Sequence, residues 1–161
     1  DNEFFQETGT EDTEFNCRIY QKSCQAVIID IPMYYWVQRP TSITHQKVNP
    51  RYIDRADSYY LCLQNIPKEN TVYRGCCLEK LFKMIINVRY HASNTPYRHL
   101  AHLTAKRLKK QTANEFLKNR HIPFHIKLSL LSFYYIPPLY SGFMKLCETK
   151  ARKNNITKKH P

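Results

Sequence analysis

The stretch TVYRGCCLEKLF, residues 71–82, joins two adjacent cysteines to the start of an apolar pattern with helical spacing. After Gly75, large apolar residues recur at i, i+3, i+4, i+7 and i+8, which is the pattern of an amphipathic helix. The residues that carry the pattern are Leu78, Leu81, Phe82, Ile85 and Ile86. The sequence therefore predicts a helix over about residues 76–91, with this apolar face in the core.

A second helix is expected over about residues 96–120, because Pro96 suits a first helical turn and helix-forming residues follow it. Four other segments favour strands, since they are rich in β-branched or aromatic residues or alternate apolar and polar side chains. They are QAVIIDI (25–31), MYYWV (33–37), SYYLCLQ (58–64) and HIKLSLL (125–131). Together these patterns predict an α+β fold with a few antiparallel strands and two central helices.

Length and charge indicate one domain between two polar arms. The 161 residues suit a single domain, and no Gly- or Ser-rich linker divides them. Six of the thirteen acidic residues lie in residues 1–14, so we expect residues 1–16 to form a mobile acidic arm. The segment 149–161 is polar and basic, which leaves residues 17–148 as the folded domain.

The six cysteines help to predict the cellular compartment in which the protein is found. They are Cys17, Cys24, Cys62, Cys76, Cys77 and Cys147. No pair has the spacing of a zinc module, no cysteine has the local signature of a catalytic thiol, and an even count allows complete pairing in about fifteen ways. We expect a disulfide-stapled domain in which the two adjacent cysteines fix two different segments to one point. Metal binding and catalysis are the alternatives.

Disulfides predict an oxidising compartment, and the sequon Asn155-Ile156-Thr157 agrees with glycosylation there. The chain begins at Asp1 rather than Met, which suits a mature secreted chain, an ectodomain or a trimmed chain equally, and no run of about eighteen apolar residues predicts a membrane span. We therefore expect a secreted glycoprotein, or one displayed on a cell or virion surface.

The basic residues are concentrated in the second half of the chain. The net charge is +12, and residues 81–161 contain sixteen Lys or Arg but only two acids. Within this half, AKRLKKQ (105–111) resembles segments that bind glycosaminoglycans, and its basic residues are Lys106, Arg107, Lys109 and Lys110. On a helix they would gather on one broad face and attract sulfate groups. The alternative is that they are only the solvated side of that helix.

Other ligand classes are not expected. Nucleic acid would be attracted by the same charge, but no RNA-binding, zinc-finger or basic-zipper pattern is present. Three glycines exclude the usual Gly-rich phosphate loops, and no nucleophile, metal-protease or paired-carboxylate motif can be identified. The sequence therefore predicts a non-enzymatic protein without a cofactor or a metal.

Two aromatic clusters indicate protein recognition instead, because aromatic residues are enriched in interface centres. The residues concerned are Tyr34, Tyr35, Trp36, Tyr134, Tyr135 and Tyr140. The alternative is that both clusters are core strands. We expect the chain to bind a protein receptor or a co-subunit, such as an accessory subunit of a viral envelope complex. A heparan-sulfate-binding module is the second hypothesis, and a small secreted hydrolase is the third.

Overall fold

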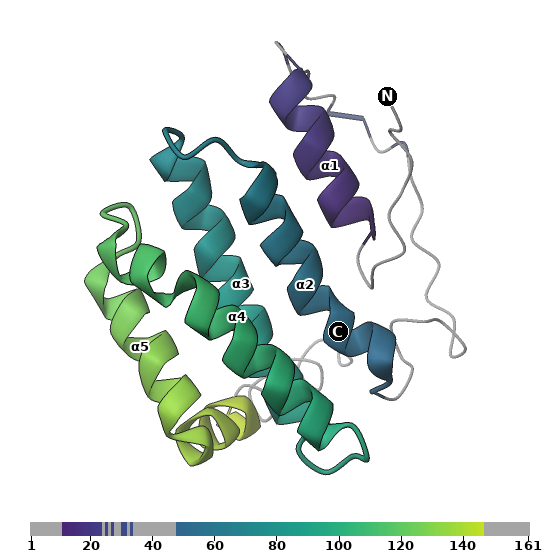
Figure 1. The fold of residues 1–161 in the computed structure, drawn as a ribbon, viewed down its shortest axis with the longest axis vertical. Coiled ribbons are helices and arrows are strands. Elements are labelled where there is room, and N and C mark those ends of the chain that lie inside the picture. The colour runs from purple at the N-terminus through teal and green to yellow at the C-terminus, as the bar shows by residue number, and fades with distance from the viewer. Residues whose placement is uncertain are drawn as a thin grey trace, which may run out of the picture.

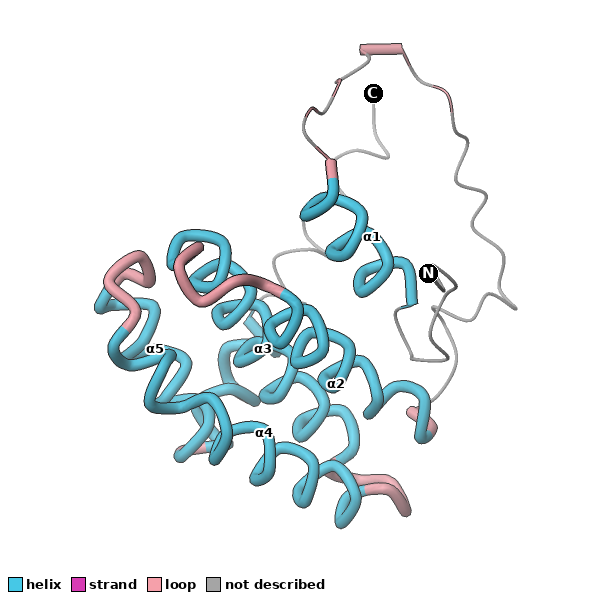
Figure 2. Tube along the Cα trace, turned by 45° about the horizontal axis from the view of Figure 1, so that its top comes forward, coloured by secondary structure: helices cyan, strands magenta, loops and turns pink. Residues whose placement is uncertain are grey.

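The computed structural model describes residues 11–23 and 48–146, together with the isolated positions 25, 27, 30, 31 and 33. The helices are α1 (Glu11–Lys22), α2 (Pro50–Asn65), α3 (Thr71–Ala92), α4 (Arg98–Lys118) and α5 (Phe124–Tyr135), followed by a helix over residues 137–146 (Figure 1). No strand occurs among these described residues, as Figure 2 shows. The expected α+β fold is wrong, and the described chain is a helical bundle.

The central helix is α3, which packs against α2, α4 and α5, while α1 packs against α2. Its expected apolar face is confirmed, because each of the five residues that define it is at most 3% exposed. The helix begins earlier than the cysteines, at Thr71, where the Asn70 side chain accepts the Tyr73 backbone N–H at 3.2 Å. The second expected helix is confirmed as α4.

SYYLCLQ (58–64) lies in α2 rather than in a strand. Asn49 caps this helix by accepting a backbone N–H of the first turn at 3.0 Å, and Pro50 occupies the first helical position. The segment contains no β-branched residue, so its tyrosines and leucines have no strong preference against a helix. Packing against α3 selects the helix, and the buried residues have helical spacing: Ile53, Ala56, Cys62 and Leu63.

HIKLSLL (125–131) lies in α5, and the strand expectation is wrong here too. In the helix, Leu130 is buried at 6% exposure while Leu128 is 56% exposed, although a strand would place them on one face. The apolar residues of α5 lie on more than one side of the helix. The sequence therefore fits the two-residue period of a strand as well as the 3.6-residue period of a helix. Of the strand segments expected at 25–31 and 33–37, the structure describes only residues 25, 27, 30, 31 and 33, none of which lies in a strand.

The expected arms are only partly described. Residues 11–16, assigned above to a mobile acidic arm, form the first half of α1. They are held there because Glu14 and Cys17 are buried against α2. Residues 1–10 and the basic segment 149–161 lie outside the described residues. None of the helices that are described combines the length and the hydrophobicity that a membrane span requires.

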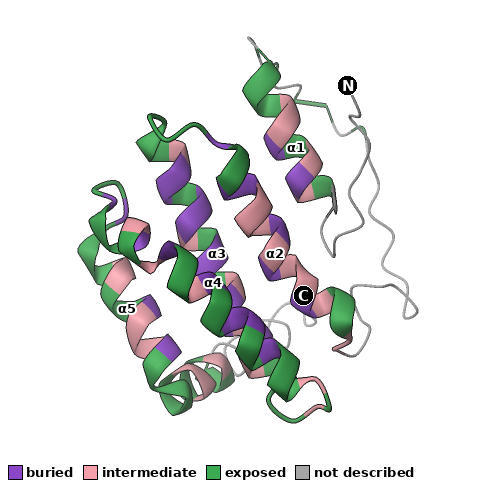
Figure 3. Cartoon of the chain, in the orientation of Figure 1, coloured by how far each residue is buried: buried purple, intermediate pink, exposed green. Residues whose placement is uncertain are grey.

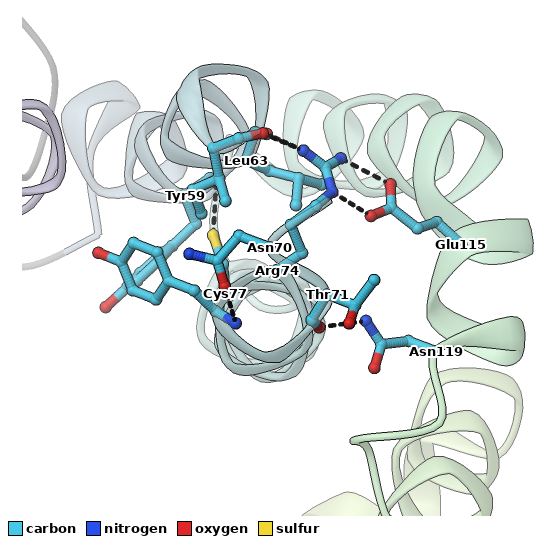
Figure 4. Close-up of polar contacts among 10 residues, drawn as sticks. Tyr59, Leu63, Asn70, Thr71, Arg74, Cys77, Glu115 and Asn119 are labelled. Atoms are coloured by element: carbon cyan, nitrogen blue, oxygen red, sulfur yellow. Dashed lines mark hydrogen bonds and ion pairs between the residues drawn. The ribbon is translucent and has the colours of Figure 1, made fainter. Parts of the chain in front are cut away.

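A buried arginine ties three helices together. Arg74 of α3 is 7% exposed and donates to the two carboxylate oxygens of Glu115 on α4, at 2.5 and 2.8 Å. It also donates to the carbonyl oxygens of Leu63 and Ile66 at the end of α2, at 2.8 and 2.5 Å. Figure 4 shows the guanidinium between the Leu63 carbonyl and Glu115. Hydrogen bonding to Glu115 raises the pKa of Arg74, so the guanidinium stays charged.

Close packing against Asn119 explains why a glycine, Gly75, lies inside α3. A Cβ at Gly75 would lie 2.9 Å from Oδ1 of Asn119, which is closer than side chains normally approach. Asn119 is itself held, because its Nδ2 donates to the Thr71 carbonyl at 2.9 Å and its Oδ1 accepts the His121 backbone N–H at 2.9 Å. Gly75 therefore lets the start of α3 approach the end of α4 closely.

Candidate binding surfaces

Three cysteines meet where α1, α2 and α3 pack together. Cys17, Cys62 and Cys77 are all buried. Their sulfur atoms lie near backbone carbonyl oxygens: Cys17 Sγ is 3.7 Å from Cys62 O, Cys62 Sγ is 3.6 Å from Thr13 O, and Cys77 Sγ is 3.3 Å from Tyr59 O. These thiols act as small apolar residues that donate weakly to the backbone. Their position makes them part of the helix packing.

The expected disulfide staple is wrong for the described residues, in which Cys17, Cys62, Cys76 and Cys77 are free thiols. Cys24 and Cys147 lie outside those residues. On α3 successive side chains diverge by about 100°, so Cys77 enters the core while Cys76 faces solvent. Cys77 lies near Cys17 and Cys62 but is bonded to neither, and Cys76 is an exposed free thiol, so the adjacent cysteines fix no second segment.

The buried thiols differ in acidity. Hydrogen bonding to Cys62 lowers the pKa of Cys17 to about 6, and the same contact together with desolvation raises the pKa of Cys62. Desolvation raises the pKa of Cys77 to about 12. No group of three or more His, Cys, Asp or Glu side chains in the described residues could hold a metal ion. The three cysteines therefore contribute to the packing of the helices, and Cys17 is the most acidic thiol among them.

The adjacent cysteines should react very differently with an alkylating reagent. We expect iodoacetamide to modify Cys76 in the folded protein while Cys77 stays protected, because Cys76 is exposed and Cys77 is buried. At neutral pH, a pKa of about 12 instead of 9.0 lowers the thiolate fraction of Cys77 about 1000-fold, and burial adds to this protection. Peptide mass mapping over time measures both sites on one peptide.

The same mapping in denaturant is the control, since both thiols should then react at similar rates. Equal reaction in the folded protein, or a Cys76 that needs reduction before it reacts, would contradict the described packing.

The basic segment lies on α4, and its four predicted residues differ in their contacts. Arg107 Nη2 donates to Asp57 Oδ1 of α2 at 2.5 Å. Lys109 Nζ donates to the Tyr135 hydroxyl at 2.9 Å and lies 4.8 and 4.7 Å from the ring centroids of Tyr134 and Tyr135. Lys106 and Lys110 remain exposed beside a shallow depression on the outer side of α4. Two of the four predicted residues are thus engaged within the protein.

The aromatic residues of the second cluster also separate. Tyr135 is exposed, Tyr134 is buried, and Tyr140 is half-buried with its hydroxyl donating to Asn87 Oδ1. Tyr134 is further fixed by Arg89, whose guanidinium lies 4.5 Å from the ring centroid and donates to the Tyr134 carbonyl at 2.8 Å. Tyr34, Tyr35, Trp36 and the sequon residue Asn155 lie outside the described residues.

An exposed apolar strip runs along α5 and the following helix. Its members are 47–79% exposed: Phe124, Leu128, Tyr135, Ile136, Leu139, Phe143 and Leu146. On α5, Phe124, Leu128 and Tyr135 recur at i, i+4 and i+11. On the next helix, Leu139, Phe143 and Leu146 recur at i, i+4 and i+7, so each helix presents one apolar face. Figure 3 shows α5 as mainly exposed or intermediate, in contrast to α3. Sequence reasoning missed this strip because it assigned the segment to a strand.

A basic cleft of about 1180 Å³ lies where the end of α3, the start of α4 and the 137–146 helix meet. Its basic residues come from three helices: Arg89, His91, Arg98, His99, His102 and Lys145. Its aromatic wall consists of Tyr90, Phe133 and Tyr140, and no acidic residue lines it. The sequence signal was the excess of Lys and Arg after residue 80, but only the fold brings these positions together.

Comparison with known proteins gives no relative: no family model, curated protein or solved structure matches this chain. The candidate surfaces are therefore interpreted from their chemistry alone.

Proposed function

We propose that this chain is a secreted or surface-displayed, non-enzymatic glycoprotein that binds a protein partner through the apolar strip. The observation that carries the proposal is that α5 is apolar on two sides, yet only one side is covered by the bundle. Leu130 and Tyr134 face the core, whereas Phe124, Leu128 and Tyr135 face outward. A helix that is apolar all round normally has both sides buried, and a contiguous exposed face of this kind marks an interaction site.

The composition of the strip favours a protein as the partner. It combines leucines with phenylalanine and tyrosine, which are the residue types enriched in the centres of protein interfaces. Lys109 and Lys127 flank it, so a polar rim is present beside the apolar centre. The sequon at Asn155 supports the proposed extracellular location, whereas the free thiols withdraw the support that disulfides would have given.

The test is saturable binding of the labelled protein to a panel of cultured cells whose surface glycosaminoglycans have been removed enzymatically. A Leu128→Asp/Leu139→Asp variant places two charges in the strip and should weaken binding about tenfold or more, because charge burial in an interface centre is costly. A matched variant, Val72→Asp/Tyr20→Asp, carries the same charge change at exposed apolar residues away from the strip. It should bind like the unaltered protein.

Both variants must first show the same helix content and melting temperature as the unaltered protein. Absence of saturable binding on every cell type, or an equal loss of binding in both variants, would contradict the proposal.

A further inference from the structure

We propose that the basic cleft and the outer side of α4 form one binding site for a sulfated polysaccharide chain. The site is distinct from the apolar strip, and it shares only Lys106 and Lys110 with the four-residue cluster that the sequence indicated. It begins in the cleft and continues along α4 through a basic track, defined here as His99, His102, Lys106 and Lys110. All four residues of the track are exposed.

The track is produced by helical spacing. Positions 99, 102, 106 and 110 recur at intervals of three or four residues, so their side chains lie within one sector of the helix surface. At about 1.5 Å per residue, the track extends over roughly 16 Å along the helix. Its first half borders the cleft, and its second half borders the shallow depression beside Lys106 and Lys110. The two hollows are thus joined by a single row of basic residues.

The arrangement of charge indicates a ligand with several anionic groups. The basic residues of the cleft belong to α3, α4 and the 137–146 helix, and the track adds two more lysines along α4. A single phosphate or carboxylate could contact only a few of these groups. An extended polyanion can contact many of them and gains from the release of its condensed counterions. No acidic residue lines either hollow to oppose such a chain.

The aromatic wall favours a polysaccharide over single-stranded nucleic acid. Tyr140 packs edge-on against Tyr90, with ring centroids 5.4 Å apart, and tilted against Phe133 at 5.3 Å. Tyr140 therefore lies against both neighbouring rings and the three form a wall, whereas base stacking needs open ring faces. Such a wall still supplies an apolar surface beside the sugar rings, while sulfate groups contact the cations.

The binding experiment uses size-defined heparin fragments and titration calorimetry at several salt concentrations. A site variant that combines Arg98→Gln in the cleft with Lys106→Gln/Lys110→Gln in the track should bind about tenfold or more weakly and lower the slope of log affinity against log salt by about three. A matched variant, Lys68→Gln/Lys80→Gln/Lys118→Gln, removes the same charge at exposed lysines elsewhere. It should change affinity by less than about twofold, because screening weakens distant charges.

Desulfated heparin fragments of the same length should bind at least about tenfold more weakly, since sulfate groups carry the contact charge. Equal losses in the two triple variants would overturn the proposal, because binding would then follow net charge alone. Failure of the unaltered protein to bind heparin fragments at physiological ionic strength would also overturn it. Tighter binding of single-stranded RNA than of heparin, with the same dependence on the track, would reassign the site to nucleic acid.

Discussion

Replacing Arg74 with methionine is expected to lower the free energy of unfolding by about 3 kcal/mol, because two buried carbonyl oxygens lose their donor and a half-exposed carboxylate loses its counter-ion. Methionine keeps much of the side-chain volume but donates no hydrogen bond. The carbonyl oxygens of Leu63 and Ile66 would lose their donor, and the Glu115 carboxylate would lose its counter-ion. Urea unfolding followed by circular dichroism measures the change.

A matched arginine pair on the surface supplies the control. Arg107 pairs with Asp57 at 2.5 Å, but the Arg107 side chain is 47% exposed, compared with 8% for Arg74. Arg107→Met should therefore cost less than about 1 kcal/mol. Glu115→Gln should fall between the two, since it keeps acceptor and shape but removes a charge. If Arg74→Met proves no more costly than Arg107→Met, the network does not hold α2, α3 and α4 together.

The core of the bundle could be predicted where the sequence had one clear period. The apolar residues from Leu78 to Ile86 fit only a helix, and the structure buries all five at the centre. By contrast, SYYLCLQ and HIKLSLL are rich in leucine and tyrosine, which fit a helix or a strand. For these segments the packing partner decides, and a single sequence does not contain the partner's position.

The candidate surfaces were accessible to sequence reasoning only in part. The excess of cations after residue 80 was visible, but Arg107 and Lys109 are engaged by Asp57 and Tyr135, which are distant in sequence. The basic cleft joins positions from 89 to 145 and exists only once the helices are packed. The cysteine count was misleading for a different reason: an even number permits disulfides but does not bring any two sulfur atoms together.

Phe116→Ala is expected to lower the free energy of unfolding by about 3–5 kcal/mol, because it removes a large ring from the centre of the α3–α4 interface. Phe116 is fully buried, and its ring stacks on that of Phe82 with centroids 3.9 Å apart and planes at 17°. The loss includes the transfer free energy of the ring and the cavity left beside Phe82. Urea unfolding of the purified variant measures it.

Such a loss approaches the whole stability of many small domains, so Phe116→Leu should be measured with it. Leucine refills part of the cavity, and the variant should lie between Phe116→Ala and the unaltered protein. The adjacent residue gives a matched control: Leu117 is 51% exposed, and Leu117→Ala should change the free energy of unfolding by less than about 1 kcal/mol. If Leu117→Ala cost as much as Phe116→Leu, the outward and inward sides of α4 would be misassigned. The placement of the basic track on the outer side of α4 would then be wrong as well, because its four residues lie on the same side as Leu117.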